Sequence, residues 1–445
     1  MKNMETIAAI ATPNGVGAIS IVRLSGDNAL DIAKKLTKKN LQPRIATLSK
    51  LYDNNNDLID IGLVIYFKAP NSFTGEDIVE FQCHGGVVVS RLVLETLFNY
   101  GARPAMPGEF TKRAFLNGKI DASQAEAIAK LIETRSREGA KLLSRQLDGD
   151  LAKFVNEVRE KLVEIMAYTE VFIDYAEEDL PETLGYEIEQ RLDTIKKLLN
   201  HTLEASKRRE GMLSGYKVAI IGKPNVGKSS ILNALLNKQR AIVSDIAGTT
   251  RDTIEEDIQI GSHLIRIIDT AGIRAAKDEI EKIGVQRSKE AIKEADIVLA
   301  VFDAGEFDSE DEEILNLIKN SNKDVIVIIN KIDKGISFDT DIFGSLPSVK
   351  ISAKEDISPL IAKLKELLDN YSGEDEHILI SARQISAVEK AVKSIEESNE
   401  FLKTGELELF SYHIQDAIKA ISEITKPFEY DEMLDKMFGS FCVGK

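Results

Sequence analysis

The stretch Gly222-Lys-Pro-Asn-Val-Gly-Lys-Ser229 decides the fold of the central part of this chain. It fits the G-x-x-x-x-G-K-[ST] phosphate-binding pattern at every fixed position. The apolar run 218–221 before it predicts a buried strand, and the apolar residues after it have helical spacing. In this order, backbone N–H groups and a helix N-terminus attract phosphate. We expect Lys228 to reach the β- and γ-phosphates and the Ser229 hydroxyl to ligate Mg²⁺.

Three later segments each follow a predicted strand, in the order of the GTPase motifs. Asp269-Thr-Ala-Gly272 follows the strand 264–268; its Asp can hold Mg²⁺ through water, and its Gly can offer an N–H to the γ-phosphate. Asn330-Lys-Ile-Asp333 follows the strand 325–329, and its Asp can accept two hydrogen bonds that guanine supplies and adenine cannot. Ser352-Ala-Lys354 is expected to close over the base. These motifs predict GTP rather than ATP.

A mobile switch is expected between the phosphate loop and Asp269, in the segment Asp245-Ile-Ala-Gly-Thr-Thr-Arg-Asp252. A Thr there can give Mg²⁺ a second ligand while the γ-phosphate is bound. Thr250 is the expected ligand, with Thr249 as the alternative, and a polar surface turn is the other interpretation. The expected nucleotide-binding residues are Asn225, Val226, Gly227, Lys228, Ser229, Ser230, Ser244, Asp245, Ile246, Ala247, Gly248, Thr249, Thr250, Asp269, Thr270, Ala271, Gly272, Asn330, Lys331, Asp333, Ser352, Ala353 and Lys354.

One position departs from the pattern of many small GTPases. Ile273 stands where those proteins carry a Gln that orients the attacking water. An isoleucine cannot orient water, so this help must come from another residue. The acidic stretch Asp278-Glu-Ile-Glu281 lies just downstream, and a carboxylate there can align water. Its spacing alone favours a solvated helix start instead.

Composition bounds the class of protein. The 445 residues are enough for about three domains at ~150 residues each. No apolar run approaches the ~20 residues of a membrane span, and residues 1–5 carry no secretory signal pattern. The two cysteines, Cys83 and Cys442, imply no disulfide framework, so a cytoplasmic location is expected. The formal net charge of −16 gives no overall attraction for nucleic acid, so contact with RNA needs a local patch, a partner or a small part of the RNA.

The pattern along the chain predicts several domains of mixed class. Residues 1–119 are typical of an α+β domain, with strand-like runs and glycine-rich turns. Residues 120–215 carry a long amphipathic helical stripe, and helical spacing returns over 372–445. The α/β segment 216–371 lies between them, a Ras-like P-loop GTPase domain with a mainly parallel sheet. It is expected to be inserted into one all-α helical domain, which is tolerated when the ends of an insert lie close together.

The chain ends in Phe438-Gly-Ser-Phe-Cys-Val-Gly-Lys445. A chain end is usually disordered, and a lone cysteine is usually a small buried hydrophobe. The pattern alone therefore leaves the role of Cys442 open.

Over its whole length the chain resembles the MnmE (TrmE) family of tRNA modification GTPases. The phosphate loop and the switch segment match, and so do Thr6-Ile-Ala-Ala-Ile-Ala-Thr-Pro13, Gly17-Ala-Ile-Ser-Ile-Val-Arg23, Pro107-Gly-Glu-Phe-Thr-Lys-Arg-Ala-Phe-Leu-Asn-Gly-Lys119 and the terminal Phe441-Cys-Val-Gly-Lys445. The nucleotide motifs alone fit several GTPases, whereas their combination with this N-terminus and this end is specific.

The resemblance implies a function in tRNA modification. With a flavin-dependent partner, MnmG (GidA), the family installs a carboxymethylaminomethyl or aminomethyl group on carbon 5 of the wobble uridine of certain tRNAs. Its N-terminal domain resembles folate-binding domains, forms a homodimer and binds 5,10-methylenetetrahydrofolate, of which 5-formyltetrahydrofolate is an analogue. The family's folate contacts fall on Arg23, Glu80, Lys119 and Lys445, as cations for the carboxylates and an acid for the pterin edge.

The resemblance also implies how GTP is hydrolysed. The family's GTPase domains dimerise across the nucleotide and need K⁺ in place of a cationic arginine finger. The ligands of K⁺ carry over to Asn225, Ser244, Ile246 and Thr249, with Ser244 and Ile246 binding through backbone carbonyls. The water-orienting glutamate carries over to Glu281, which overturns the interpretation as a solvated helix start. Cys442 carries over as a residue needed for modification but not for GTP hydrolysis.

Two other functions remain as alternatives. The first is a ribosome-assembly GTPase that binds RNA without modifying it; it shares the nucleotide motifs but leads one to expect a basic RNA-binding module. The second is a folate-dependent one-carbon transferase in which the GTPase is only a regulator. Folate binding by residues 1–119 alone, with one-carbon transfer independent of GTP, would favour it.

Overall fold

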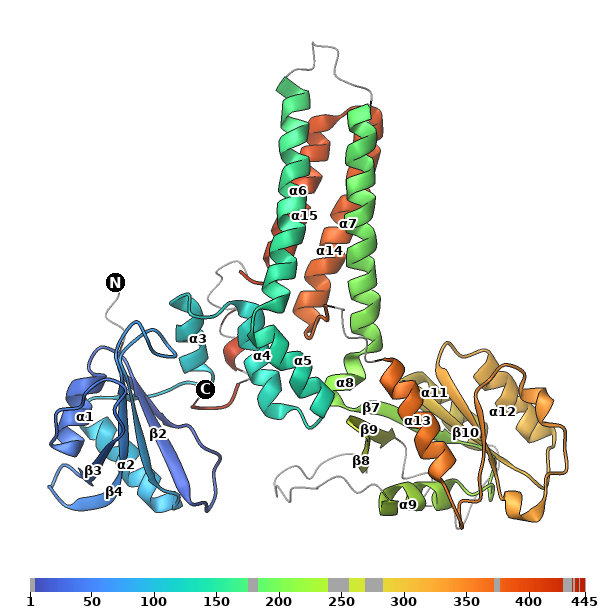
Figure 1. The fold of residues 1–445 in the computed structure, drawn as a ribbon, viewed down its shortest axis with the longest axis horizontal. Helices are drawn as coiled ribbons and strands as arrows, with labels where there is room; N and C mark the ends of the chain where they lie inside the picture. Colours follow the sequence, from blue (N-terminus) through green and yellow to red (C-terminus); the bar gives the residue numbers. More distant parts are fainter. Residues whose placement is uncertain are drawn as a thin grey trace. The chain divides into compact units, whose positions relative to one another are not determined.

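The computed structural model describes residues 5–174, 183–238, 256–268, 283–371, 377–426, 434, 437–439 and 441–444 (Figure 1). The chain divides into two compact units. The first contains residues 1–129, 146–189 and 393–445, and the second contains residues 130–145 and 190–392. The domain boundaries expected from the sequence, at 119, 215 and 371, stay a prediction.

The N-terminal part is built on a six-stranded sheet with the order β3-β4-β5-β2-β1-β6. Its strands are β1 (Ile7–Ile10), β2 (Ile19–Ser25), β3 (Thr47–Tyr52), β4 (Leu58–Phe67), β5 (Ile78–His84) and β6 (Arg103–Pro104). All neighbours pair antiparallel except β1 and β6. Alternate residues such as Val22 and Phe81 form a buried core with α1 (Ala29–Thr37) and α2 (Val87–Asn99). Because neighbouring residues of a strand point to opposite faces, Arg23 and Glu80 lie on the other face.

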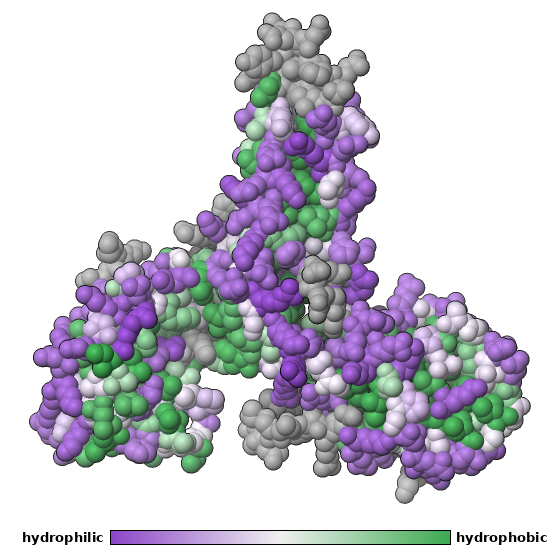
Figure 2. All heavy atoms as spheres, in the orientation of Figure 1, coloured by the Kyte–Doolittle hydropathy of each residue, from purple (hydrophilic) through white to green (hydrophobic). Residues whose placement is uncertain are grey.

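The helical part continues from α3 (Glu109–Leu116). Its helices are α4 (Ala122–Glu133), α5 (Arg137–Leu147), α6 (Asp150–Asp174), α7 (Thr183–Arg208), α8 (Glu210–Ser214), α14 (Ala382–Thr404) and α15 (Leu407–Ser422). The predicted apolar stripe of α6 is buried from Leu151 to Ile165, and α6 packs along α15. On the face that Figure 2 shows, hydrophilic side chains cover much of these long helices, with hydrophobic side chains visible between them. None of the helices that the structure describes is long and apolar enough to cross a membrane.

A second six-stranded sheet, with the order β12-β11-β10-β7-β9-β8, forms the nucleotide-domain fold. Its strands are β7 (Tyr216–Ile221), β8 (Glu256–Ile260), β9 (His263–Ile268), β10 (Ile297–Asp303), β11 (Asp324–Asn330) and β12 (Ser348–Lys350). β8 is antiparallel to β9, and the other neighbours are parallel. Parallel sheets are covered on both faces, and this explains the continuous apolar runs of β7, β10 and β11.

Within the described residues, helices α9 (Lys228–Lys238), α11 (Ile283–Glu294), α12 (Ser309–Lys319) and α13 (Ser358–Asn370) cover the two faces of this sheet. On one face, the apolar core includes α9 and α13. On the other, it includes α11 and α12. The expected fold class is therefore confirmed: an α+β N-terminal part, an all-α part and a P-loop domain with a mainly parallel sheet. The loops after the parallel strands meet at one sheet edge, where such folds bind ligands.

Candidate functional site

The phosphate loop joins the end of β7 to the start of α9, as its sequence predicts. Gly222 has a φ of 148°, and a Cβ there would collide with the carbonyl oxygen of Val301. Gly227 has a φ of 105°, and a Cβ there would collide with Nδ2 of Asn330. Both glycines are thus required by backbone conformation and by close packing. They draw the loop against the ends of the neighbouring parallel strands.

Asn330 connects the loop to the other nucleotide motifs. Its side chain is 1% exposed, and its Nδ2 donates to the carbonyl oxygen of Val226 at 2.8 Å. Its Oδ1 accepts from the N–H of Ala353 at 2.9 Å. Lys331 adds a second link, because its Nζ donates to the carbonyl oxygen of Asn225 at 2.6 Å. The structure therefore brings together three segments that are far apart in the sequence.

The base end of the site carries two exposed charged side chains. Asp333 lies in the short 3-10 helix η1 (Ile332–Lys334) and is exposed, as is Lys354. The backbone oxygen of Ser352 accepts from the N–H groups of Glu355 and Asp356, so the loop turns tightly there. The buried hydroxyl of Ser352 has no hydrogen-bond partner within the described residues. The carboxylate of Asp333 is thus accessible for a base at this end.

The phosphate end carries a cation that is partly removed from water. The Nζ of Lys228 donates to the carbonyl oxygens of Gly222 and Lys223, at 2.7 and 2.8 Å. Burial lowers the pKa of the Lys228 ammonium. Phosphate oxygens beside this ammonium would favour its charged form. Ser229 and Ser230 are exposed in the first turn of α9, where the helix N-terminus favours an anion.

Sequence reasoning missed an ion-pair cluster at Lys223, inside the phosphate loop. Its Nζ lies 2.7 Å from Oδ2 of Asp311 and 2.8 Å from Oδ2 of Asp308. Burial would lower the pKa of Lys223, but its hydrogen bonds with the two carboxylates raise the pKa above its usual value. Asp311 is 0% exposed, and burial raises its pKa. Asp308 caps α12 in a capping box with Asp311, a pattern that the sequence does show.

Other expected site residues lie outside the described residues. These are Ser244, Asp245, Ile246, Ala247, Gly248, Thr249, Thr250, Asp269, Thr270, Ala271, Gly272, Glu281 and Lys445. Their roles stay predictions. β9 ends at Ile268, directly before Asp269, and runs parallel to β7. Asn225 is described: it is exposed and has a left-handed φ of 63°.

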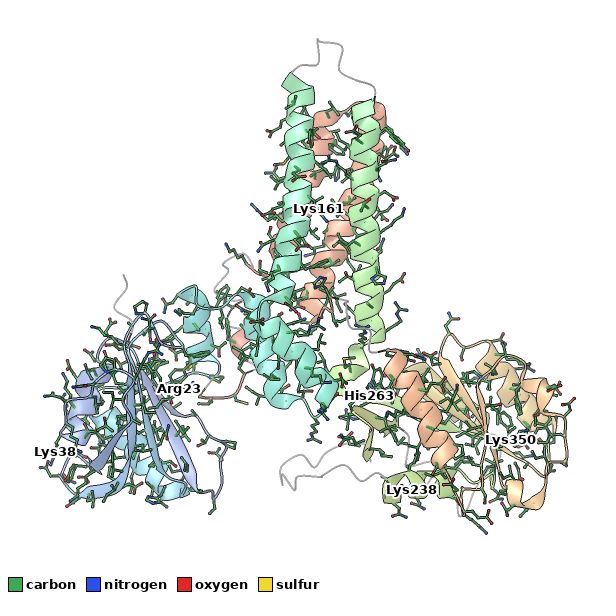
Figure 3. The ribbon with its side chains drawn as sticks, in the orientation of Figure 1. Arg23, Lys38, Lys161, Lys238, His263 and Lys350 are labelled. Carbon is green, nitrogen blue, oxygen red and sulfur yellow. The ribbon has the colours of Figure 1, made fainter. Side chains whose placement is uncertain are left out.

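The expected folate residues lie in the N-terminal part. Arg23 of β2, which is labelled in Figure 3, lies directly opposite Glu80 of β5 and forms an ion pair with it at 2.9 Å. The guanidinium of Arg23 also lies 5.8 Å from the ring centroid of Phe73. The Nζ of Lys119 donates to the carbonyl oxygen of Pro70 at 3.0 Å. Segment 70–75 therefore contacts both cations, and it brings them to one region of this unit.

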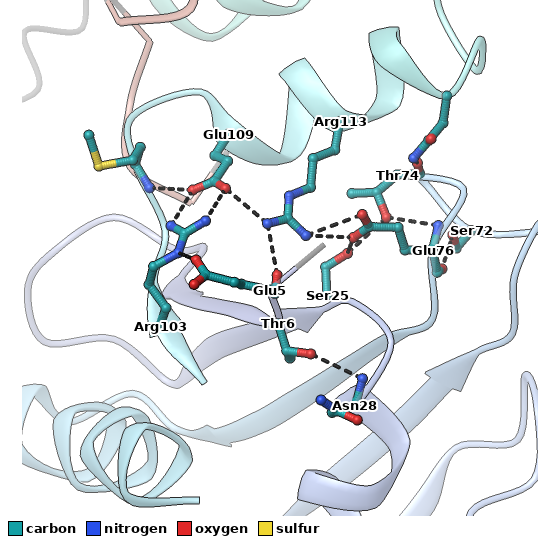
Figure 4. A network of polar contacts seen from close by, with 12 residues as sticks. Glu5, Thr6, Ser25, Asn28, Ser72, Thr74, Glu76, Arg103, Glu109 and Arg113 are labelled. Carbon is teal, nitrogen blue, oxygen red and sulfur yellow. Dashed lines mark hydrogen bonds and ion pairs between the residues drawn. The ribbon is translucent and has the colours of Figure 1, made fainter. Parts of the chain in front are cut away.

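A second polar network fixes α3 beside this region (Figure 4). Arg113 is 4% exposed and binds Glu76 at 2.9 Å and Glu109 at 3.0 Å. Arg103 binds Glu109 at 2.7 Å and also pairs with Glu5. Burial would raise the pKa of Glu109, but hydrogen bonds from Arg103, Arg113 and the Met106 N–H lower it to about 2. The first turn of α3 is thus held by several charged contacts at once.

The two cysteines differ in environment. Cys83 is buried in β5, and burial raises the pKa of its thiol to about 11. Cys442 is exposed, and its backbone oxygen accepts from the N–H of Gly108 at 3.3 Å. A reaction that needs an accessible thiolate is therefore expected at the exposed Cys442 and not at the buried Cys83.

Comparison with known proteins identifies the family. A model of the MnmE helical domain matches residues 123–442, and a model of the N-terminus of the GTP-binding protein TrmE matches residues 6–119. The tRNA modification GTPase MnmE of Aliarcobacter butzleri is 58% identical over all of both chains. The protein of that name from Sulfurimonas denitrificans is 57% identical over 99% of each chain. The one from Sulfurovum sp. is 55% identical over 100% of this chain and 99% of its own. Matches of this extent, on a chain whose nucleotide motifs meet at one sheet edge, show that it belongs to the MnmE family of tRNA modification GTPases.

Proposed function

We propose that this chain is a K⁺-dependent GTPase that acts with the flavin-dependent partner MnmG (GidA). Together they would add a carboxymethylaminomethyl or aminomethyl group to carbon 5 of the wobble uridine of certain tRNAs, with a tetrahydrofolate one-carbon donor. The observation that carries the GTPase part is the position of Asn330, which joins the phosphate loop through Val226 and the closing loop through Ala353. Family membership supports the substrate, tRNA.

The chain's residues have separate tasks in hydrolysis. Lys228 neutralises phosphate charge, and Asp333 accepts hydrogen bonds from guanine. Ser229, Thr250 and, through water, Asp269 would hold Mg²⁺, which stabilises the charge that develops on the phosphates. Glu281 takes the task of orienting the attacking water, because Ile273 cannot. Of these residues, Lys228, Ser229 and Asp333 are described. The bond from Asn330 to the oxygen of Val226, which joins the phosphate loop to the segment before Asp333, supports this assignment.

The described residues fit the two proposed ligands that distinguish this function. At Asn225 the backbone oxygen is engaged by Lys331 while the exposed side chain remains available, and an amide oxygen suits a hard cation such as K⁺. K⁺ would supply positive charge to the transition state. In the N-terminal part, Arg23 and Glu80 place a cation and a carboxylate side by side beside the Phe73 ring. This set matches the carboxylates and the polar pterin edge of a folate.

The test measures GTP turnover by the purified protein in matched KCl and NaCl, together with analysis of the wobble nucleoside in tRNA from a deletion strain. We expect turnover to be strongly activated by K⁺, and the modified uridine to be absent without this protein. Equal turnover in both salts would refute the K⁺ site. A normal wobble uridine in the deletion strain would refute the modification function and favour the ribosome-assembly alternative.

A further inference from the structure

We propose that Gly108 and Gly444 form a clip that seats the end of the chain on the N-terminal part, and that this clip positions Cys442 for tRNA modification. The positioning role rests on the proposed function, whereas the seating itself does not. Both glycines lie in the first compact unit. Four sets of contacts support the clip, and they are described in turn.

The first set is an apolar anchor at Phe438. This ring is 1% exposed and belongs to a buried cluster with Ala125 and Leu434. Its centroid lies 6.2 Å from that of Phe115 in α3 and 5.3 Å from that of Phe441. Burial of aromatic rings is the main attraction that can hold a chain end against a domain. The anchor lies four residues before Cys442 in the sequence.

The second set is at Gly108, directly before α3. Its N–H donates to the backbone oxygen of Cys442 at 3.3 Å. Its φ is 64°, and a Cβ there would lie 2.5 Å from the backbone oxygen of Phe438 and 3.0 Å from Cβ of Phe441. A backbone oxygen cannot rotate away as a side chain can. A Cβ at residue 108 would therefore push the whole terminal segment off its seat.

The third set is at Gly444, on the other side of Cys442. Gly444 is buried with a φ of 96°, and a Cβ there would collide with the backbone oxygen of Ile10 and lie 3.1 Å from Cα of Ala11. Ile10 is the last residue of β1, and the residue before it, Ala9, pairs with Arg23 across the sheet. The two glycines thus hold the backbone on both sides of an exposed thiol. They hold it at the end of the strand that borders the Arg23–Glu80 pair.

The fourth set keeps the seat itself in place. Glu109, the residue after Gly108, accepts hydrogen bonds from Arg103, from Arg113 and from the N–H of Met106 (Figure 4). These contacts fix the first turn of α3 on the strands of the sheet. A rigid seat is needed if the clip is to determine where Cys442 lies. The contacts therefore assign the clip a positioning function for the thiol, separate from the nucleotide motifs of the second unit.

The experiment compares Gly108→Ala with the matched control Gly118→Ala. Gly118 has nearly the same φ, 67°, but a Cβ there meets nothing within 4 Å. Because the two φ values are similar, both substitutions introduce similar backbone strain. Only Gly108→Ala also fills the space that the terminal segment occupies. The first readout is trimming of the full-length protein by a carboxypeptidase, followed by mass spectrometry. Because Gly444 is buried, trimming past it requires release of the segment and reports the released population.

We expect trimming to be at least about tenfold faster in Gly108→Ala, which corresponds to about 1.4 kcal/mol, and unchanged in Gly118→Ala. GTP turnover should equal that of the unaltered protein in both variants, which shows that the nucleotide domain is folded, and unchanged circular dichroism spectra should show that the N-terminal part is folded as well. Gly444→Ala tests the other half of the clip and should also release the segment. Trimming at the original rate in both Gly108→Ala and Gly444→Ala would overturn the clip.

The second readout is tRNA modification by the chain with its flavin-dependent partner. Gly108→Ala should lower it at least about tenfold. Adding Gly108→Ala to Cys442→Ser should cost little more than Cys442→Ser alone, because residues that act as one unit are not additive. Additive losses, or a released segment with full modification, would overturn the positioning role. If the unaltered protein does not modify tRNA, the proposed function fails, and the trimming rates still decide whether the clip exists.

Discussion

Replacing Asn330 by alanine tests whether this side chain organises the nucleotide site. The change removes the hydrogen bonds from Nδ2 to the oxygen of Val226 and from the N–H of Ala353 to Oδ1. Asn330 is 1% exposed, so water cannot easily replace either bond. Each loss costs about 1–1.5 kcal/mol, and the two together cost about 2–3 kcal/mol. If this cost appears in nucleotide binding, GTP affinity falls about 30- to 150-fold.

The assay is titration of the protein with a fluorescent, non-hydrolysable GTP analogue. The matched control is Asn316→Ala, the same substitution at an exposed position of α12. The control should bind nucleotide with the Kd of the unaltered protein. A folded Asn330→Ala protein whose Kd lies within about threefold of the control would refute the reasoning, since the two bonds would then contribute nothing to the order of the site.

Three further predictions concern charged groups. Glu281→Ala should nearly abolish GTP hydrolysis without changing GTP affinity, because Ile273 cannot align water; unchanged steady-state turnover would contradict this assignment. Asp311→Asn weakens a charged hydrogen bond that holds Lys223 in the phosphate loop. The KM for GTP should therefore rise about tenfold, with a smaller change in kcat. Equal changes in KM and kcat would point to a different role for Asp311. The pKa of Glu109 falls from about 4.5 in the unfolded chain to about 2 in the folded one, so its stabilisation of about 3 kcal/mol is present above pH 4.5 and is lost between pH 4.5 and 2. Hydrogen-exchange protection of α3, corrected for the intrinsic effect of pH, should therefore fall over this range, and much less in Glu109→Gln.

The nucleotide motifs could be predicted from the sequence because their geometry is local. A strand, a glycine loop and a helix follow each other within about twenty residues from Val218 to Lys238, and the requirement for glycine at 222 and 227 follows from backbone conformation. The sequence did not show that the amide of Asn330 would occupy the space beside Gly227, because that contact joins residues 103 positions apart.

Other features depend on pairings that no local pattern carries. Lys223 lies in the phosphate loop and Asp311 lies in α12, at different parts of the sheet. In the sequence, each of these charged residues by itself is typical of a position exposed to solvent. Arg23 and Glu80 likewise resemble exposed strand residues until β2 and β5 are paired in register. The end of the chain is the clearest case, because termini are usually disordered. Its seat on Gly108 is created by tertiary contacts with α3, and only the resemblance pointed to Cys442 beforehand.

The described parts of the two sites lie in different compact units. The phosphate loop and the guanine motif belong to the second unit, whereas Arg23, Glu80 and the clip belong to the first. Within one chain, segments that enter both units can carry an effect of GTP hydrolysis to the N-terminal part. The helices α4, α5, α7 and α14 do so, and each is continuous across the boundary. A packed helix moves as a stiff element. If a change at the switch segments moved one of these helices, the movement would therefore reach the first unit, although the two sites share no residue.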